Sequence, residues 1–176
     1  MRRMAARTLP RLVVCARTRE YRRAALELVY AGDVALEIGC HEGLTSAILE
    51  RRCGEAGAVL GVDRSRPAVA AAQVRFPSAE YPNLRFEVCD FPRDLPNGAA
   101  MPARGSDADA VIPFSVVFMD LGGDARLSVV LRALVILEEL SGLRLLVVKS
   151  EALRDLHRRW AANCAQASLA KPVQDL

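Results

Sequence analysis

No stretch of the sequence is both long and apolar enough to cross a membrane. The longest apolar runs, at 129–137 and 143–148, are interrupted by charge and fall short of the roughly 20 apolar residues that a transmembrane helix needs. We therefore predict no transmembrane helix. A chain of 176 residues with 52% hydrophobic and 26% charged content instead suits one compact domain with a single core.

Cysteine and lysine are also scarce. Lys149 and Lys171 are the only lysines among 24 basic residues, and the net charge of +3 is modest. The five cysteines form an odd set without a CxxC pair, and several of them lie in apolar surroundings. We therefore expect neither a disulfide framework nor a metal site.

The first 19 residues lack acidic side chains and carry six arginines. An organelle presequence has this balance, and so does an exposed basic arm, so the location is either cytoplasmic or organellar. Residues 11–16 read as a basic residue followed by a short apolar strand, which argues against a cleaved segment. We divide the chain into a basic N-terminal arm, 1–19, and one domain, 20–176.

Short apolar runs alternate with helical patterns along the rest of the chain. A helix from Glu20 precedes the first run, and apolar positions at helical spacing follow most of the others. Strands separated by helices cannot pair as hairpins, so we predict an α/β fold with a doubly wound parallel sheet. The predicted strands are 34–38, 58–62, 84–89, 115–119 and 144–148.

Capping residues and turn-rich segments set the predicted boundaries. Ser65, Asp124 and Ser150 can each cap a helix. Residues 91–113, rich in Pro, Gly, Ala and Asp, interrupt the alternation and are predicted to form a long mobile loop. The helix after Ser150 is expected to bury a face made of Leu153, Leu156 and Trp160.

Polar or charged residues stand where each predicted strand ends. In an open parallel sheet, ligands bind outside the carboxyl ends of the strands. Apolar residues precede each of these positions, so this edge is a candidate site, although helix capping or solvated strand ends would use the same residue types. The residues are Glu37, Asp63, Asp90, Asp120 and Lys149.

The segment at 34–43, Val-Ala-Leu-Glu-Ile-Gly-Cys-His-Glu-Gly, resembles the first motif of class I S-adenosylmethionine-dependent methyltransferases. Asp63 resembles their second acidic position, and a carboxylate on such a strand end is suited to accept both ribose hydroxyls of an adenosine. The resemblance covers roughly residues 34–150 and implies a Rossmann-like core that binds S-adenosylmethionine. The implied cofactor residues are Glu37, Gly39, Cys40, His41, Gly43, Asp63, Arg64, Asp90, Phe91 and Asp120.

The resemblance also implies individual roles. The family's acid at the position of Glu37 organises the loop and attracts the cofactor's amino group, while Asp90 matches an acid that contacts the adenine amino group. Gly39 and Gly43 would let the backbone approach the cofactor. His41 stands where the family often has a glycine, which leaves contact with the methionine part in doubt. A nicotinamide dehydrogenase loop reads GxGxxG and is not matched here, so we disfavour an oxidoreductase.

Asp120 and Lys149 are the candidate catalytic residues, because they end neighbouring central strands. An Asp with a Lys there is similar to RNA ribose 2′-hydroxyl methyltransferases, which implies orientation or deprotonation of a hydroxyl. The structural alternative is an ion pair of Lys149 with Asp120 or Glu151. The acceptor stays undetermined, and RNA, whose phosphates a basic arm could contact, ranks ahead of protein and small molecules.

One departure from the family concerns residues 161–176, where we find no pair of strands for the usual C-terminal hairpin. A minimal domain, a truncated chain and a protein partner that completes the open sheet edge would each account for this. The departure keeps open a second function, that of a noncatalytic methyltransferase-like binding or assembly subunit.

Overall fold

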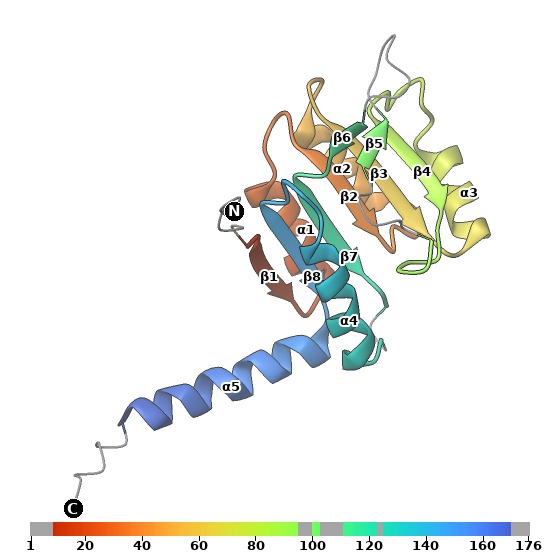
Figure 1. Ribbon diagram of the computed structural model, residues 1–176. Helices are drawn as coiled ribbons and strands as arrows, with labels where there is room; N and C mark the ends of the chain where they lie inside the picture. The colour runs from red at the N-terminus through yellow and green to blue at the C-terminus, as the bar shows by residue number, and fades with distance from the viewer. Residues whose placement is uncertain (1–8, 95–99, 103–110, 123–124, 170–176) are drawn as a thin grey trace, which may run out of the picture.

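Six parallel strands form the central sheet of the computed structural model, which describes residues 9–94, 100–102, 111–122 and 125–169 (Figure 1). The spatial order is β1-β8-β7-β2-β3-β4. Every neighbouring pair is parallel, because a helix separates most strands that are consecutive in the chain. The strands are β1 Arg11–Cys15, β2 Val34–Ile38, β3 Ala58–Asp63, β4 Leu84–Val88, β7 Val116–Asp120 and β8 Leu145–Lys149.

Helices cover both faces of this sheet, so the predicted doubly wound α/β fold is confirmed. The first face packs against α1 (Thr18–Leu28), α2 (Leu44–Cys53) and α3 (Arg66–Arg75). The second packs against α4 (Leu127–Glu138) and the start of α5 (Glu151–Leu169). The central strands β2, β7 and β8 are almost wholly buried as a result.

Two of the predicted helix caps are present. The Ala68 amide donates to Ser65 Oγ at 3.4 Å, and the Leu153 amide donates to Ser150 Oγ at 3.2 Å. Asp124 lies outside the described residues, and α4 begins after Arg126 without a side-chain cap. Both confirmed caps follow a strand end, so each turns the chain sharply beside the candidate site.

The short strand expected at 11–16 is β1, which forms one edge of the sheet. It pairs in parallel with β8, with Arg11 opposite Leu145 and Cys15 opposite Lys149. The expected boundary between arm and domain at residue 19 falls inside α1. The sheet therefore includes a segment that precedes the first helix.

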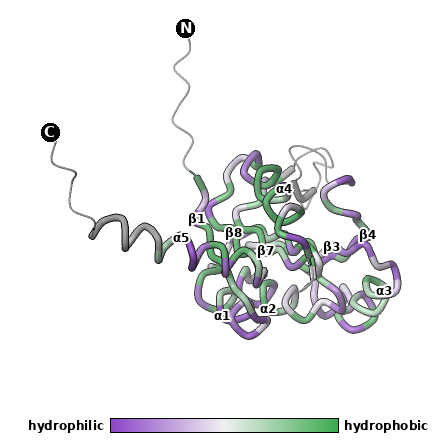
Figure 2. Tube along the Cα trace, turned by 90° about the horizontal axis from the view of Figure 1, so that it is seen from below, coloured by the Kyte–Doolittle hydropathy of each residue, from purple (hydrophilic) through white to green (hydrophobic). Residues whose placement is uncertain are grey.

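The predicted burial of Trp160 is wrong. Its side chain is 67% exposed, whereas Leu153 on the same helix is buried. The reason is that α5 leaves the body after its first turns, beside β1 (Figures 1 and 2). Amphipathic spacing alone does not show whether a helix meets a partner surface.

The segment predicted as one long loop contains two short strands. These are β5 (Ala100–Pro102) and β6 (Val111–Pro113), which pair antiparallel and form a separate ribbon. Their prolines argue against strands in a large sheet, but a two-stranded ribbon has free edges where the missing N–H costs nothing. At the end of the chain, residues 161–169 belong to α5.

None of the helices in the described part of the chain is long and apolar enough to span a bilayer.

Candidate functional site

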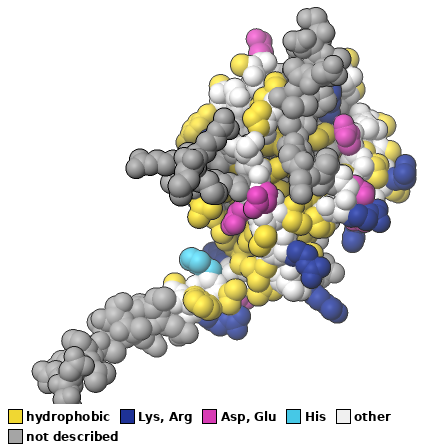
Figure 3. All heavy atoms as spheres, in the orientation of Figure 1, with side chains coloured by type: hydrophobic (Ala, Val, Ile, Leu, Met, Phe, Trp, Pro, Cys, Tyr) yellow, Lys and Arg dark blue, Asp and Glu magenta, His cyan; other side chains and the backbone are white. Residues whose placement is uncertain are grey.

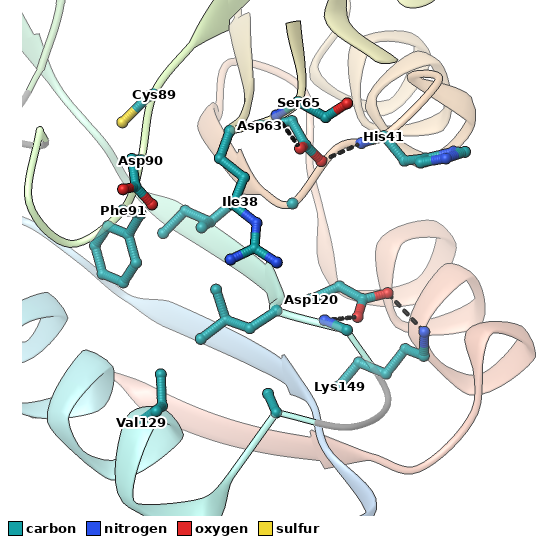
Figure 4. Close-up of a pocket in the computed structure, with 15 residues that line it drawn as sticks. Ile38, His41, Asp63, Ser65, Cys89, Asp90, Phe91, Asp120, Val129 and Lys149 are labelled. Atoms are coloured by element: carbon teal, nitrogen blue, oxygen red, sulfur yellow. Dashed lines mark hydrogen bonds and ion pairs between the residues drawn. The ribbon is translucent and has the colours of Figure 1, made fainter. Parts of the chain in front are cut away.

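The predicted strand-end residues meet around two adjoining hollows at the carboxyl edge of the sheet (Figure 4). The main hollow has a volume of about 640 Å³, within the usual range for small-molecule sites. Asp63, Asp90, Asp120 and Lys149 line it. The small hollow, of about 90 Å³, lies beside it and is bordered by Glu37. The remaining walls of the main hollow are Ile38, Gly39, His41, Arg64, Ser65, Cys89, Phe91, Leu121, Gly122, Ala125 and Val129.

Asp63, at the end of β3, is held by two backbone donors. The His41 amide donates to Oδ2 at 3.0 Å, and the Ser65 amide donates to Oδ1 at 2.9 Å. A carboxylate has about four acceptor sites, so both oxygens keep capacity for a ligand. The two bonds fix the carboxylate at the rim of the main hollow, as Figure 4 shows.

The loop after β2 folds back onto β3. The amides of Gly39 and Cys40 donate to the Val62 carbonyl at 2.8 and 3.0 Å. His41 adopts a left-handed conformation with φ of 49°, which few residues other than glycine adopt. Its imidazole is exposed and points away from the centre of the main hollow (Figure 4). The family's glycine is thus replaced by a residue under local backbone strain.

The two predicted loop glycines are required by contacts within the chain. A Cβ on Gly39 would lie 1.8 Å from the backbone oxygen of Asp120, so the loop can pass the end of β7 only without a side chain. A Cβ on Gly43 would lie 2.5 Å from Phe86 Cζ. Gly39 borders both hollows and Gly43 borders neither. A contact of Gly43 with the cofactor stays a prediction.

Glu37 is buried below the loop, where Ser46 Oγ donates to its Oε2. Desolvation and, to a smaller extent, the Asp120 charge raise the pKa of Glu37 to about 8, although the Ser46 hydrogen bond opposes the rise. In the free protein this carboxyl is therefore mostly protonated at neutral pH. A cation placed beside it would favour the ionised form.

Cys40 and Tyr21 also border the small hollow. Burial raises the pKa of the Cys40 thiol well above its usual value, so this side chain is a neutral apolar wall. Tyr21, on α1, is 1% exposed, and its hydroxyl has no hydrogen-bond partner among the described residues. Sequence reasoning missed Tyr21 and Ser46 because each reads as an ordinary helix residue.

Asp120 and Lys149 end neighbouring strands, as predicted, and form an ion pair. The Nζ–Oδ2 distance is 2.6 Å, and the two side chains are 20% and 18% exposed. The Gly122 amide donates to the other oxygen, Oδ1, at 3.1 Å. The pair holds the ends of β7 and β8 together and places a fixed carboxylate at the main hollow.

Asp90 and Phe91 follow β4 and line the far end of the main hollow, and Arg64, which follows β3, also lines this hollow. The Asp90 carboxylate lies 3.4 Å from the Arg93 guanidinium, an exposed pair that is worth little to stability. Cys89 lines the same end, and burial raises the pKa of its thiol. Within the described part of the chain, no cluster of His, Cys, Asp and Glu could hold a metal ion.

A match to a known protein family agrees with the fold and with the position of the two hollows. A family model described as a methyltransferase domain matches residues 35–135, more than half of the chain. A search of curated proteins finds no match. The family assignment therefore rests on this domain match together with the sheet described above.

Solved structures of methyltransferases are among those that match part of this chain. A protein-L-isoaspartate O-methyltransferase is 22% identical over 67% of this chain and 34% of its own, with a TM-score of 0.45. Fibrillarin from Aeropyrum pernix, solved with natively bound S-adenosylmethionine, is 19% identical over 66% and 49%, with a TM-score of 0.46. A putative rRNA-methylase from Clostridium thermocellum is 19% identical over 66% and 57%, with a TM-score of 0.46. This chain spans less than two thirds of the length of each. On the domain match, the chain belongs to the class I S-adenosylmethionine-dependent methyltransferase family.

Proposed function

We propose that this protein transfers a methyl group from S-adenosylmethionine to an acceptor hydroxyl, with RNA as the candidate acceptor. The observation that carries the proposal is the Asp63 carboxylate, which two backbone amides fix at the rim of the main hollow. A carboxylate fixed in this way suits a pair of vicinal hydroxyls, because each oxygen can accept one hydrogen bond. An adenosine ribose presents such a pair.

The other walls of the main hollow fit the adenine half of the cofactor. Ile38, Phe91 and Leu121 offer apolar surface for a flat ring. Asp90 offers an acceptor for an exocyclic amino group. The volume of about 640 Å³ leaves room beside the ring for an acceptor group to enter.

Glu37 and the loop after β2 would hold the amino-acid end of the cofactor. This end carries an ammonium group, and Glu37 borders the small hollow beside the loop. An ammonium group there would stabilise the Glu37 carboxylate against the burial that otherwise keeps it protonated. The buried Tyr21 hydroxyl, which has no partner among the described residues, is available to the same group.

The bound cofactor supplies a methyl group already activated on a sulfonium, so the protein mainly has to align the acceptor. Asp120 would orient an acceptor hydroxyl or accept its proton. Lys149 would hold that carboxylate in position through the 2.6 Å ion pair.

A noncatalytic binding or assembly subunit is the second candidate. The observation that favours it is the same ion pair, which leaves neither Asp120 nor Lys149 free of a partner. The free edge of β1 would then be the place where the predicted protein partner pairs with the sheet. A cytoplasmic or organellar location stays a prediction for either function.

Calorimetric titration of S-adenosylmethionine into the full chain tests the first step. We expect saturable binding that is lost in Asp63→Ala and retained in Glu80→Ala, a matched control with an exposed carboxylate away from both hollows. Circular dichroism of both variants checks the fold. Absence of binding to the folded wild-type protein would overturn the proposal.

A further inference from the structure

Most of α5 projects from the body and has no cover within the described chain. The helix has 19 residues and is about 28 Å long at the usual rise of about 1.5 Å per residue. Among its described side chains, 151–162, only Leu153 is buried, and Figure 1 shows the helix running away from the sheet. Helices in proteins owe most of their stability to the packing of one face and not to intrinsic propensity. A projecting helix of this kind therefore calls for a second surface.

The apolar face of α5 continues beyond the part that contacts the body. Leu153, Leu156 and Trp160 follow one another at spacings of three and four residues, so they lie along one face of the helix. Leu153 is 7% exposed, Leu156 is half-buried and Trp160 is 67% exposed. The face thus begins in the core and ends in solvent. We call its outer part, Leu156 and Trp160, the α5 face.

A second uncovered apolar surface lies on α4. Leu131 and Val135, four residues apart, are neighbours on the helix surface and are 41% and 64% exposed. Figure 2 shows α4 as a hydrophobic helix at the surface, and Figure 3 shows hydrophobic side chains gathered near the base of α5. Exposed apolar side chains that cluster in this way mark an interaction site. We call Leu131 and Val135 the α4 patch.

Charges of opposite sign lie beside these two surfaces. Arg159 follows the α5 face; its guanidinium donates to the Asp155 carbonyl of its own helix at 3.3 Å and pairs with no described carboxylate. Glu138 is exposed and lies two helical turns beyond Leu131, at the end of the α4 patch. A carboxylate at a helix C-terminus is unfavourable to the helix dipole, and the last turn of α4 holds no basic residue. A cation from another molecule would therefore stabilise this end of α4.

We propose that the missing cover is a second copy of this chain. The α5 face of each copy packs on the α4 patch of the other, and Arg159 of each copy pairs with the partner's Glu138. Within one chain α5 points away from the body, so its outer part cannot cover its own α4 patch (Figure 1). A reciprocal exchange is a closed twofold contact that covers both apolar surfaces and pairs both charges at once. An unrelated partner would have to supply two different surfaces.

Sedimentation equilibrium of the full chain measures this association. We expect the average mass to rise from 19.2 kDa toward twice that value as the concentration increases from about 1 to 100 µM. Trp160 is the only tryptophan, so its emission shifts to shorter wavelength over the same range. Trp160→Glu places a charge in the contact and weakens association at least about thirtyfold. The control Val74→Glu changes an exposed apolar residue of α3 and leaves association unchanged.

The charge pair provides a test that is specific for reciprocal exchange. Arg159→Glu and Glu138→Arg each reverse one member of both symmetry-related pairs, so each variant alone associates about tenfold more weakly. When the two variants are mixed, both pairs form again between unlike chains, and association returns to the wild-type level. The control Arg85→Glu reverses an exposed charge on β4 and associates like the wild type.

Circular dichroism checks that each variant is folded, and the two charge reversals carry the test if Trp160→Glu loses helix. The proposal is overturned if the wild-type chain stays monomeric at about 100 µM. It is also overturned if folded Trp160→Glu associates as tightly as the wild type, or if the mixture associates as weakly as the single variants. The measurement needs no cofactor and no acceptor, so its outcome is independent of the proposed function.

Discussion

The protonation state of Glu37 makes cofactor affinity depend on pH. With a pKa of about 8 in the free protein, roughly 1% of Glu37 is ionised at pH 6 and roughly 9% at pH 7. If the cofactor's ammonium group requires the carboxylate, the dissociation constant falls about ninefold across this interval. The ammonium itself stays charged there, because an α-amino group has a pKa of about 7.7–8.0.

Calorimetry at pH 6.0, 6.5 and 7.0 measures this dependence. Glu37→Gln cannot ionise, so we expect it to bind more weakly and to lose the dependence. The control Glu55→Gln removes an exposed carboxyl outside both hollows, and we expect it to retain the pH dependence. A wild-type dissociation constant that changes less than twofold, or an unchanged ninefold effect in Glu37→Gln, would refute the reasoning.

The same carboxyl affects the stability of the free protein in the opposite direction. An unfolded glutamate ionises near pH 4.3, whereas folded Glu37 keeps its proton up to about pH 8, so the folded state binds more protons between these values. Its contribution to the free energy of unfolding therefore falls as pH rises through this window, by at most about 1.4 kcal/mol per pH unit. As pH rises, cofactor affinity therefore increases while the stability of the cofactor-free protein decreases.

Three further changes test the loop and the core. Gly39→Ala places a methyl group 1.8 Å from the Asp120 backbone oxygen, so we expect at least about 3 kcal/mol of destabilisation in urea melts. His41→Gly relieves a φ of 49° and raises the free energy of unfolding by up to about 1 kcal/mol. Asp33 is buried and paired with Arg144, so Asp33→Ala costs about 2–4 kcal/mol. Desolvation would raise the pKa of Asp33, but hydrogen bonds led by Arg144 outweigh it and lower the pKa, so this stability is lost as pH falls below about 4.

The two loop changes can each be contradicted by a clear result. Gly32 also has a positive φ, 86°, but no atom lies within 4 Å of a Cβ there, so Gly32→Ala costs only the backbone term of about 1–2 kcal/mol. Equal losses in the two alanine variants would contradict the steric argument for Gly39. A less stable His41→Gly would show that the imidazole, and not the backbone, decides that position.

The strand ends were predictable from sequence because each apolar run stops at a polar residue. Asp63 and Asp120 needed only that pattern and the rule that parallel strands present their carboxyl ends at one edge. The caps at Ser65 and Ser150 were equally local. Local signals thus sufficed for the sheet and for most residues of the main hollow.

Features that depend on distant segments were not predictable. The pairing of β1 with β8 joins opposite ends of the described chain, and no local pattern specifies it. The exposure of Trp160 depends on where α5 points, which its periodicity does not encode. Ser46 became part of the site only once α2 was seen to pack over β2 and to bring its hydroxyl to Glu37.

The position of β1 also orders the events of folding. Arg11 pairs with Leu145, so this edge of the sheet cannot form until nearly all of the described chain has left the ribosome. Until β8 is available, the backbone N–H and C=O groups of β1 lack their partners in the sheet. The entropy cost of closing a loop grows only slowly with loop length, but a long loop slows the search for the native pairing. The last strand to be synthesised, β8, is therefore the one that allows the first strand, β1, to join the sheet.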